Sequence, residues 1–368
     1  MTCPSSSRPL YLFTASPTLF SSLSLLPKTI PIMPSKVLIC GNVKQNLVWA
    51  TEDAKEILGA ADAEIVPFTS QSREEFLNDL KGKYSDIVAI YRHNDSANSI
   101  GVFDPEIINA LPSSVKYICH NGAGYDQIDL PSSTARGIEV SHTPGAVDDA
   151  TATTAMFLIL SSLRQYWKAE TNARSGKWKQ GLSPAHDPEG KTIGIIGMGG
   201  IGSVVGKRCL AFGMKVIYHN RNPISPAPDF ECEYVADRDE LLKRSDIVSL
   251  NLPLNDKTKG SFGKAEFEKM KDGSILINTA RGGVVDQEAL IEALTNGKLY
   301  SAGLDVFPNE PEIDQRLVEM NHITLLPHMG TEARGTQRKM ECQALKNIAS
   351  ALQGKGLINQ VAEQKQKK

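Results

Sequence analysis

Residues 191–222 read KTIGIIGMGGIGSVVGKRCLAFGMKVIYHNRN, and this stretch decides how the surrounding chain folds. An apolar run at 193–196 leads into three glycines with the spacing GxGxxG, and a second apolar run follows at 216–218. The residues between the two runs have helical periodicity, which ends at Gly213 and places these side chains on one face: Ile201, Val205, Cys209 and Phe212. Strand, glycine turn, helix and strand in this order form the context that a dinucleotide-binding fingerprint requires.

Each glycine of the motif has a physical role in this interpretation. Gly197 permits the tight turn, Gly199 lets a pyrophosphate approach the backbone, and Gly202 lets the helix pack closely on the strand. The helix would begin at Gly200 and Ile201, where free N–H groups can bind the phosphates. A glycine-rich turn in an ordinary βαβ unit is the alternative interpretation.

The residues after the second apolar run indicate which dinucleotide binds. A site that prefers NAD usually has an acidic residue about twenty positions after the glycines, bonded to the ribose hydroxyls. No Asp or Glu occurs here between Glu189 and Asp229, and the position is occupied by His219, Asn220 and Arg221. A cation and an amide suit a 2′-phosphate, so the sequence predicts NADP(H), with NAD(H) as the second choice. A solvated loop arginine is the alternative for Arg221.

The composition is that of an ordinary globular protein. A chain of 368 residues with 41% hydrophobic and 22% charged residues can form two domains. The formal net charge of −2 gives no electrostatic reason to expect a nucleic-acid or membrane partner. The six cysteines are scattered, without a CxxC or a Cys/His cluster, which argues for a reducing compartment and against a structural metal. No apolar stretch is long enough to span a bilayer.

Residues 1–33 differ from the rest of the chain. They are rich in Ser, Pro and Leu and contain no Asp or Glu, as in a mitochondrial transit peptide. Five prolines interrupt any amphipathic helix, which favours a disordered tail or an over-extended gene model with Met33 as the start. We therefore expect a cytoplasmic protein, and a mitochondrial one if this extension is a targeting segment.

Two arrays of alternating strands and helices follow, which predicts an α/β protein with two parallel sheets. The first array has predicted strands at 37–40, 65–66, 87–90 and 115–119, with helices from just after Val43 to 59, at 73–80 and from 104. The second has strands at 193–196, 216–218, 246–250, 274–278, 301–306 and 323–326, with helices at 239–243, 264–270 and 287–294. A helix at 149–164 is apolar nearly all round and is predicted to lie buried between the domains, and a last helix spans 332–352.

Three strand ends of the second array carry residues suited to reduction of a 2-oxo acid. Arg281 can hold a carboxylate as a fork, His328 can donate a proton to a carbonyl oxygen, and Glu310 can orient the imidazole. Ligands in open α/β sheets bind where strands end, so the three side chains are predicted to converge. Taken singly, each could be a loop arginine, an acid at a helix start or a histidine in a turn.

At these residues the chain resembles a known family. The phrases NTARGGVVD, SAGLDVF, PNEP and LPHMGT, with GMGGIG upstream, are similar to those of the D-isomer-specific 2-hydroxyacid dehydrogenases. The resemblance implies an NAD(P)-binding Rossmann domain, residues 149–333, inserted into a discontinuous flavodoxin-like substrate domain, residues 34–148 with 334–368. It also implies a homodimer and a cleft that closes over the cofactor.

The family's functional residues fall on particular positions of this chain. The resemblance implies that Arg281, Glu310 and His328 are catalytic, and that Ala123 and Gly124, in HNGAGYDQIDL, bind the substrate carboxylate together with Arg281 and His328. Further cofactor contacts are implied at Thr154, Pro253, Thr279 and Asp305, the last with a backbone-capping acid as its alternative.

The glyoxylate/hydroxypyruvate reductase branch is the most similar part of the family. A D-mandelate-type or broad-range dehydrogenase is the alternative, and a dinucleotide-sensing protein like the transcriptional corepressors of this fold is a more distant one. Tyr91, Arg92, Trp167 and Trp178 are candidates to shape the pocket or a dimer arm, with packing or surface exposure as the favoured explanation.

Overall fold

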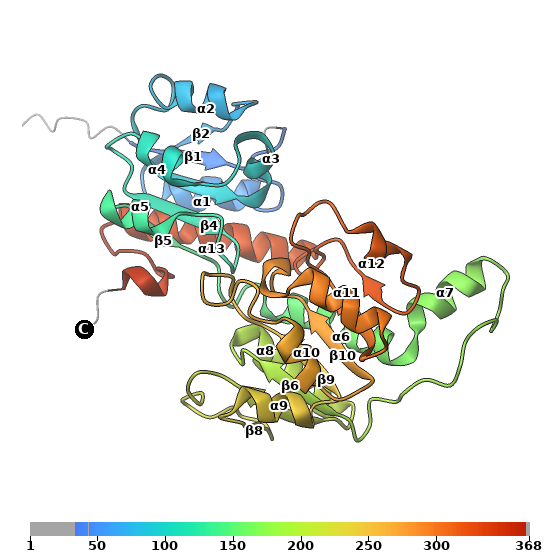
Figure 1. Ribbon diagram of the computed structural model, residues 1–368. Coiled ribbons are helices and arrows are strands. Elements are labelled where there is room, and N and C mark those ends of the chain that lie inside the picture. Colours follow the sequence, from blue (N-terminus) through green and yellow to red (C-terminus); the bar gives the residue numbers. More distant parts are fainter. Residues whose placement is uncertain (1–33, 43, 366–368) are drawn as a thin grey trace, which may run out of the picture. The chain divides into compact units, whose positions relative to one another are not determined.

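Two parallel β-sheets with helices packed on their faces make up the part of the chain that the structure describes (Figure 1). The structure is a computed structural model, and it describes residues 34–42 and 44–365. The extension predicted at 1–33 lies outside this range. Every pairing within both sheets is parallel, as the alternation of strands and helices predicts.

The first sheet has the strand order β2-β1-β3-β4-β5, which is the flavodoxin-like order. Its strands are β1 (Ser35–Cys40), β2 (Ala63–Pro67), β3 (Ile87–His93), β4 (Tyr117–Asn121) and β5 (Glu139–Ser141). Alternate residues of β1 point to opposite faces, so that Leu38 and Val37 join different buried clusters. β4 begins two residues later than predicted, and the three-residue β5 was not predicted.

Helices cover both faces of the first sheet. They are α1 (Thr51–Gly59), α2 (Arg73–Asp79), α3 (Ala97–Ile100), α4 (Pro105–Ala110), α5 (Leu130–Ala135) and α13 (Arg334–Leu352), with 3₁₀ turns η1 (Asn94–Ser96) and η3 (Ala362–Gln364). Asp104 caps α4 by accepting a hydrogen bond from the N–H of Ile107, with Pro105 in the first turn, as its sequence predicts. α1 begins at Thr51, later than predicted, because residues 44–50 have an irregular backbone with a turn and bends.

The second sheet has the order β12-β11-β10-β9-β6-β7-β8. Its strands are β6 (Thr192–Ile196), β7 (Lys215–His219), β8 (Glu233–Tyr234), β9 (Ile247–Leu250), β10 (Ser274–Asn278), β11 (Leu299–Leu304) and β12 (Thr324–Leu325). Without the edge strand β12 this is the order of a dinucleotide-binding Rossmann sheet, and the order reverses between β6 and β9. Ligands bind such sheets at the reversal point, which is where the GxGxxG turn lies.

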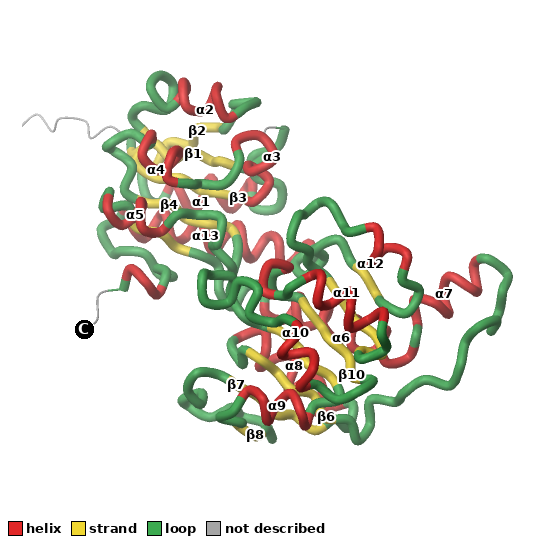
Figure 2. Tube along the Cα trace, in the orientation of Figure 1, coloured by secondary structure: helices red, strands yellow, loops and turns green. Residues whose placement is uncertain are grey.

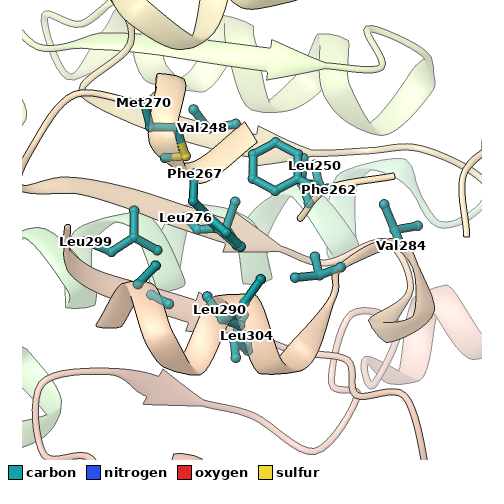
Figure 3. Packing of buried hydrophobic residues seen from close by; sticks show 14 of the residues in the cluster. Val248, Leu250, Phe262, Phe267, Met270, Leu276, Val284, Leu290, Leu299 and Leu304 are labelled. Carbon is teal, nitrogen blue, oxygen red and sulfur yellow. The ribbon is translucent and has the colours of Figure 1, made fainter. Parts of the chain in front are cut away.

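Two layers of helices enclose the second sheet (Figure 2). They are α6 (Asp148–Arg164), α8 (Gly200–Ala211), α9 (Arg238–Arg244), α10 (Lys264–Lys269), α11 (Gln287–Thr295) and α12 (Gln315–Glu319), with the 3₁₀ turn η2 (Gly282–Val284). The helix α7 (Tyr166–Arg174) follows α6 and projects from the sheet. Figure 3 shows the buried cluster on one face, where Leu276 of β10 lies near Phe267 of α10 and Leu290 of α11. The neighbouring β10 residues, Ile275 and Ile277, belong to the cluster on the opposite face.

The helix predicted at 149–164 is buried as expected, but the prediction that it lies between the domains is wrong. α6 packs on the second sheet, because Ala155, Leu158 and Ile159 share a buried cluster with Ile195 of β6 and Val205 of α8. The prediction that Phe212 lies on the buried face of α8 is also wrong. Phe212 is 42% exposed, because α8 ends at Ala211.

The last helix, α13, returns to the first sheet. Its residues Ala344, Leu345 and Ile348 are buried in one cluster with Val37 and Ile39 of β1. This packing supports the proposal that residues 34–148 and 334–368 form one discontinuous domain around the inserted residues 149–333. Among the residues that the structure describes, no helix is both long and apolar enough to cross a membrane.

Candidate active site

The predicted functional residues follow the carboxyl ends of strands in both sheets. The glycine turn follows β6, Arg281 follows β10, Glu310 follows β11 and His328 follows β12. The loop that contains Ala123 and Gly124 follows β4 of the first sheet. Because parallel strands end at one edge of their sheet, each sheet brings its own part of the site to that edge.

The glycine turn has the backbone geometry that the sequence predicts. Gly197 has φ +98°, a conformation that side chains rarely allow. A Cβ on Gly202 would lie 2.5 Å from the Gly197 carbonyl oxygen, so α8 can approach β6 this closely only without a side chain. A Cβ on Gly199 would meet nothing within 4 Å, which leaves open space beside the first N–H groups of α8. This space and these donors fit a pyrophosphate.

Two of the three residues predicted to bind the cofactor at the end of β7, His219 and Asn220, have side chains that contact backbone groups. The Asn220 side chain accepts a hydrogen bond from the N–H of Met198 at 2.7 Å and donates one to its carbonyl oxygen at 3.4 Å. Nδ1 of His219 lies 3.0 Å from the Val235 carbonyl oxygen. Arg221 is exposed, and no described residue forms an ion pair or hydrogen bond with its side chain. Arg221 is therefore the group at this strand end that is available to a ligand.

A cavity of about 690 Å³ lies among these loops. The predicted site residues in its walls are Ala123, Gly124, Ile201, Pro253, Thr279 and Arg281. Thr151 of α6 also lines the cavity, whereas Thr154, one turn further along the helix, does not. Loops that follow strands of both sheets thus contribute to one cavity.

Arg281 is oriented by contacts on two edges of its guanidinium group. Nε donates to Oδ1 of Asp126 at 2.9 Å, and Nη1 donates to the Ala280 carbonyl oxygen at 2.9 Å. Nη2 lies against Gly124, where a Cβ would collide with it. Nη2 therefore lies beside the loop at Gly124, and no described residue accepts a hydrogen bond from it, so it is available to a carboxylate.

The loop at residues 122–124 directs its carbonyl oxygens away from the cavity. Gly122 O accepts from the N–H of Thr143 at 2.9 Å, Ala123 O contacts Nδ1 of His142 at 2.7 Å, and Gly124 O contacts Nε2 of His120 at 2.9 Å. No described residue accepts a hydrogen bond from the N–H of Ala123 or Gly124. Free N–H groups beside Arg281 form a suitable site for an anion.

His328 and Glu310 form the pair that the sequence predicts. Nδ1 of His328 lies 2.7 Å from Oε2 of Glu310, and Oε1 of Glu310 accepts a hydrogen bond from the N–H of Phe307 at 2.9 Å. Burial raises the pKa of Glu310, but the hydrogen bond and charge of His328, followed by Phe307 and Arg281, bring it below its usual value. The glutamate is thus held as a carboxylate against Nδ1, which leaves Nε2 of His328 for proton transfer.

Asp305 holds the backbone turn that presents His328. Its carboxylate accepts hydrogen bonds from the N–H groups of Met329 at 2.6 Å and Gly330 at 2.9 Å, and its carbonyl oxygen accepts from His328 at 2.8 Å. His328 has φ +56°, a strained conformation for a residue with a side chain, and these bonds maintain it. Burial raises the pKa of Asp305 to about 6 against the effect of the two N–H donors. These contacts match the backbone-capping alternative for Asp305.

Several residues of this site were not identified from the sequence. Asp126, two positions after Gly124 in HNGAGYDQIDL, pairs with Arg281. A carboxylate this close to a predicted anion site could have indicated that an arginine lies beside it. The roles of His120 and His142 could not be predicted in this way, because each ring contacts a backbone carbonyl oxygen, which every residue has. Tyr91 and Arg92 are buried outside the cavity walls, in agreement with packing, whereas Trp167 and Trp178 are 41% and 76% exposed.

Comparisons with known proteins agree with this geometry. Residues 156–330 match the family described as D-isomer specific 2-hydroxyacid dehydrogenase, NAD binding domain. The chain is 46% identical over 334 residues to 4-methyl-2-oxopentanoate reductase A of Aspergillus oryzae, covering 90% of this chain and 99% of that protein. It is 43% identical over 306 residues to glyoxylate reductase 1 of Saccharomyces cerevisiae, covering 81% and 87%.

A solved structure is also similar. The crystal structure of a glyoxylate reductase from Paecilomyes thermophila superposes with a TM-score of 0.86 at 46% identity, covering 91% of this chain and all of that one. The similarity therefore extends over both sheets as well as the glycine turn.

Proposed function

The chain belongs to the D-isomer-specific 2-hydroxyacid dehydrogenases, a family of NAD(P)-dependent oxidoreductases, and we propose that it is an NADPH-preferring reductase of small 2-oxo acids. The proposed reactions convert glyoxylate to glycolate and hydroxypyruvate to D-glycerate. The observation that carries the proposal is the His328–Glu310 pair, whose Nδ1 and Oε2 atoms lie 2.7 Å apart. Arg281 and the free N–H groups of Ala123 and Gly124 add a site for a carboxylate. These are a proton donor and a carboxylate site, the two elements that reduction of a 2-oxo acid requires.

Each protein group has one role in the proposed reaction. Arg281 and the N–H groups of Ala123 and Gly124 bind the substrate carboxylate, which orients the adjacent carbonyl group. His328 donates the proton on Nε2 to the carbonyl oxygen, and Glu310 holds the ring through Nδ1. When bound, the nicotinamide dinucleotide supplies the hydride for the carbonyl carbon.

The residues after β6 and β7 fit a phosphorylated dinucleotide. The open space at Gly199 and the N-terminus of α8 suit the pyrophosphate, and the exposed Arg221 suits a 2′-phosphate. We assign Gly197, Gly200, Ile201 and Gly202 to the same turn, and Pro253 and Thr279 to the cofactor side of the cavity. Asn220 contributes by holding the turn at Met198. Contacts of Asp305 and Thr154 with the cofactor stay predictions.

A second candidate substrate class is favoured by the apolar wall of the cavity. Val102, Phe103, Leu254 and Met340 line it, and these side chains could pack against a larger aliphatic or aromatic substrate group. A relative named for 4-methyl-2-oxopentanoate supports a bulkier 2-oxo acid, and a phenyl group would correspond to the mandelate-type alternative. Such an enzyme would use the same catalytic groups.

The proposed function is tested with a panel of 2-oxo acids, each assayed with NADPH and with NADH. We expect turnover of glyoxylate and hydroxypyruvate with a higher kcat/KM for NADPH. Higher kcat/KM for 4-methyl-2-oxopentanoate or phenylglyoxylate would select the second substrate class. No oxidation of either cofactor with any acid would exclude the enzyme and favour a dinucleotide-sensing protein.

Arg221→Asp should remove the preference for NADPH. The variant places a negative charge where the 2′-phosphate is expected, so kcat/KM for NADPH should fall by about tenfold or more while NADH is nearly unaffected. The measurement is kcat/KM for both cofactors with glyoxylate. Arg164→Asp, which lies at the end of α6 and pairs with Asp187, is the control for loss of an exposed arginine. An equal loss for both cofactors would contradict the assignment.

We also propose that the protein is a homodimer, as the resemblance implies. The support is a group of exposed aromatic side chains on α6, α7 and the following loop: Phe157 at 49%, Trp167 at 41% and Trp178 at 76%. In Figure 1, α7 and this loop project from the second sheet. The double variant Trp167→Ser/Trp178→Ser should shift the mass measured by light scattering from dimer towards monomer. Trp49→Ser, at another exposed tryptophan, should not. A monomeric wild-type protein would exclude the proposal.

A further inference from the structure

Arg92 is a buried cation for which the reaction has no direct use. It lies on β3 with 0% exposure, and no other lysine or arginine of the described chain is buried. No described carboxylate forms an ion pair with it, and Asp126, whose charge reaches it, is paired with Arg281 instead. Burying a charge without an ionic partner is costly, so such a group is retained only where its hydrogen bonds serve the structure or the function.

The hydrogen bonds of Arg92 lead to the back of the cavity wall. Nη1 donates to Oδ1 of Asn94 at 2.7 Å, and Nη2 donates to Oε1 of Gln127. The guanidinium group also lies 5.7 Å from the ring centre of Phe103. Asn94, Phe103 and Gln127 all line the cavity, although Arg92 does not. The cation therefore lies directly behind this part of the wall.

A third contact connects Arg92 to the loop at residues 122–124 through His120. Nε2 of His120 lies 2.9 Å from the Gly124 carbonyl oxygen, which can only accept, so Nε2 carries a proton. Nδ1 lies 3.4 Å from Nη1 of Arg92 and 3.3 Å from the backbone carbonyl oxygen of Arg92. Burial, and then the charge of Arg92, lower the pKa of His120 well below its usual value, so the ring is neutral and Nδ1 is free to accept. The neutral ring has a single N–H, which the shorter contact with Gly124 places on Nε2, so Nδ1 can accept from Nη1 of Arg92.

We propose that Arg92 and His120 are positioning residues for substrate binding: Arg92 orients the His120 ring, the ring holds the Gly124 carbonyl oxygen, and the loop N–H groups consequently face the substrate carboxylate. The inference rests on the proposed function in one respect, that this loop binds a carboxylate. The loop has little freedom to adjust, since a Cβ on Gly122 would lie 2.5 Å from Nε2 of His120. Loss of either side chain would therefore release the loop on the side away from the cavity.

The test measures the loop and the anion site separately. Amide hydrogen exchange of residues 120–129 reports on the loop, and calorimetric binding of oxamate, an unreactive isostere of a 2-oxo acid, to the NADPH complex reports on the anion site. Arg92→Met and His120→Leu should speed exchange in the loop and weaken oxamate binding by about tenfold, the effect of losing one buried hydrogen bond. KM for glyoxylate should rise in parallel, with the Kd for NADPH within twofold of wild type.

Two further variants separate positioning from general stability. His120→Gln retains an N–H donor near the position of Nε2 and should restore most of the oxamate affinity lost in His120→Leu. Arg136→Met is the matched control, because Arg136 also donates to backbone carbonyl oxygens of the first domain, those of Ile108 and Pro112, without contacting the loop. It should leave loop exchange and oxamate binding unchanged.

The outcomes distinguish this inference from the proposed function. Loop exchange and oxamate affinity within twofold of wild type in both Arg92→Met and His120→Leu would overturn the inference, as would equal losses in His120→Gln and His120→Leu. If the wild-type protein neither reduces 2-oxo acids nor binds oxamate, the proposed function fails. Hydrogen exchange still decides in that case whether Arg92 and His120 hold the loop.

Discussion

His328→Ala should lower kcat for reduction of glyoxylate by about 10²- to 10⁴-fold, because it removes the proposed proton donor. The Kd for NADPH should stay close to wild type, since the glycine turn and Arg221 lie on other loops. The measurement is steady-state kinetics together with NADPH binding followed by fluorescence. A proton donor acts only in the transition state, so the loss should appear in kcat more than in KM.

His186→Ala is the control for this substitution. His186 is an exposed histidine that meets the Tyr300 ring edge to face, with ring centres 5.0 Å apart, and it lies outside the site. Its replacement should leave kcat unchanged. Unchanged turnover in His328→Ala would exclude the role of His328 as general acid, and an equal loss in both variants would indicate a general effect on folding.

Arg281→Met should lower kcat/KM by about 10²- to 10³-fold, since truncating one partner of a hydrogen-bonded charge pair costs about 2–5 kcal/mol. The substrate carboxylate would lose its fork and the reacting carbonyl its orientation. Arg281→Lys should recover only part of the loss, because lysine retains the charge without the planar donors. The measurement is kcat/KM for glyoxylate at saturating NADPH.

Arg281→Met also breaks the ion pair with Asp126, so its control is a variant that breaks this pair but keeps the guanidinium group. Asp126→Asn does so, and its effect on kcat/KM should be much smaller than that of Arg281→Met. Arg238→Met, which breaks the Arg238–Glu266 pair between α9 and α10, is the control for loss of an ion pair elsewhere, on helices that cover the second sheet. If Asp126→Asn and Arg281→Met were equally impaired, the ion pair and not carboxylate binding would explain the loss.

Patterns within short stretches were enough to predict both sheets and most of the elements on them. Short apolar runs identified strands such as β1 and β10, which are buried on both faces over most of their length, and the helix-stop prediction at Gly213 is confirmed by its φ of +70°. That Arg281, Glu310 and His328 follow strand ends could be predicted without any knowledge of their contacts. The structure pairs Glu310 with His328, and of the three residues only Arg281 lines the cavity, so their convergence on one substrate stays a prediction. The bounds of α1 and β4 were less accurate, because element ends depend on neighbouring packing.

The placement of α6 shows why burial alone does not identify a partner. Its apolar surface predicts that it is covered nearly all round, and the structure covers it with the second sheet and α8. Phe157 nevertheless remains 49% exposed on the same helix. Hydrophobicity specifies that a surface is covered but carries no information about which element covers it.

By itself, the sequence determined two parallel α/β sheets, a dinucleotide turn after β6 and the strand ends that carry the reactive residues. These features depend on local periodicity, on glycine conformation and on the rule that parallel strands end at one edge. Only the tertiary structure decided that Asp126 pairs with Arg281, 155 positions away, and that Arg92 and His120 hold the loop at Gly124. Such contacts depend on which side chains face each other across separate strands, and no local pattern in the sequence encodes that choice.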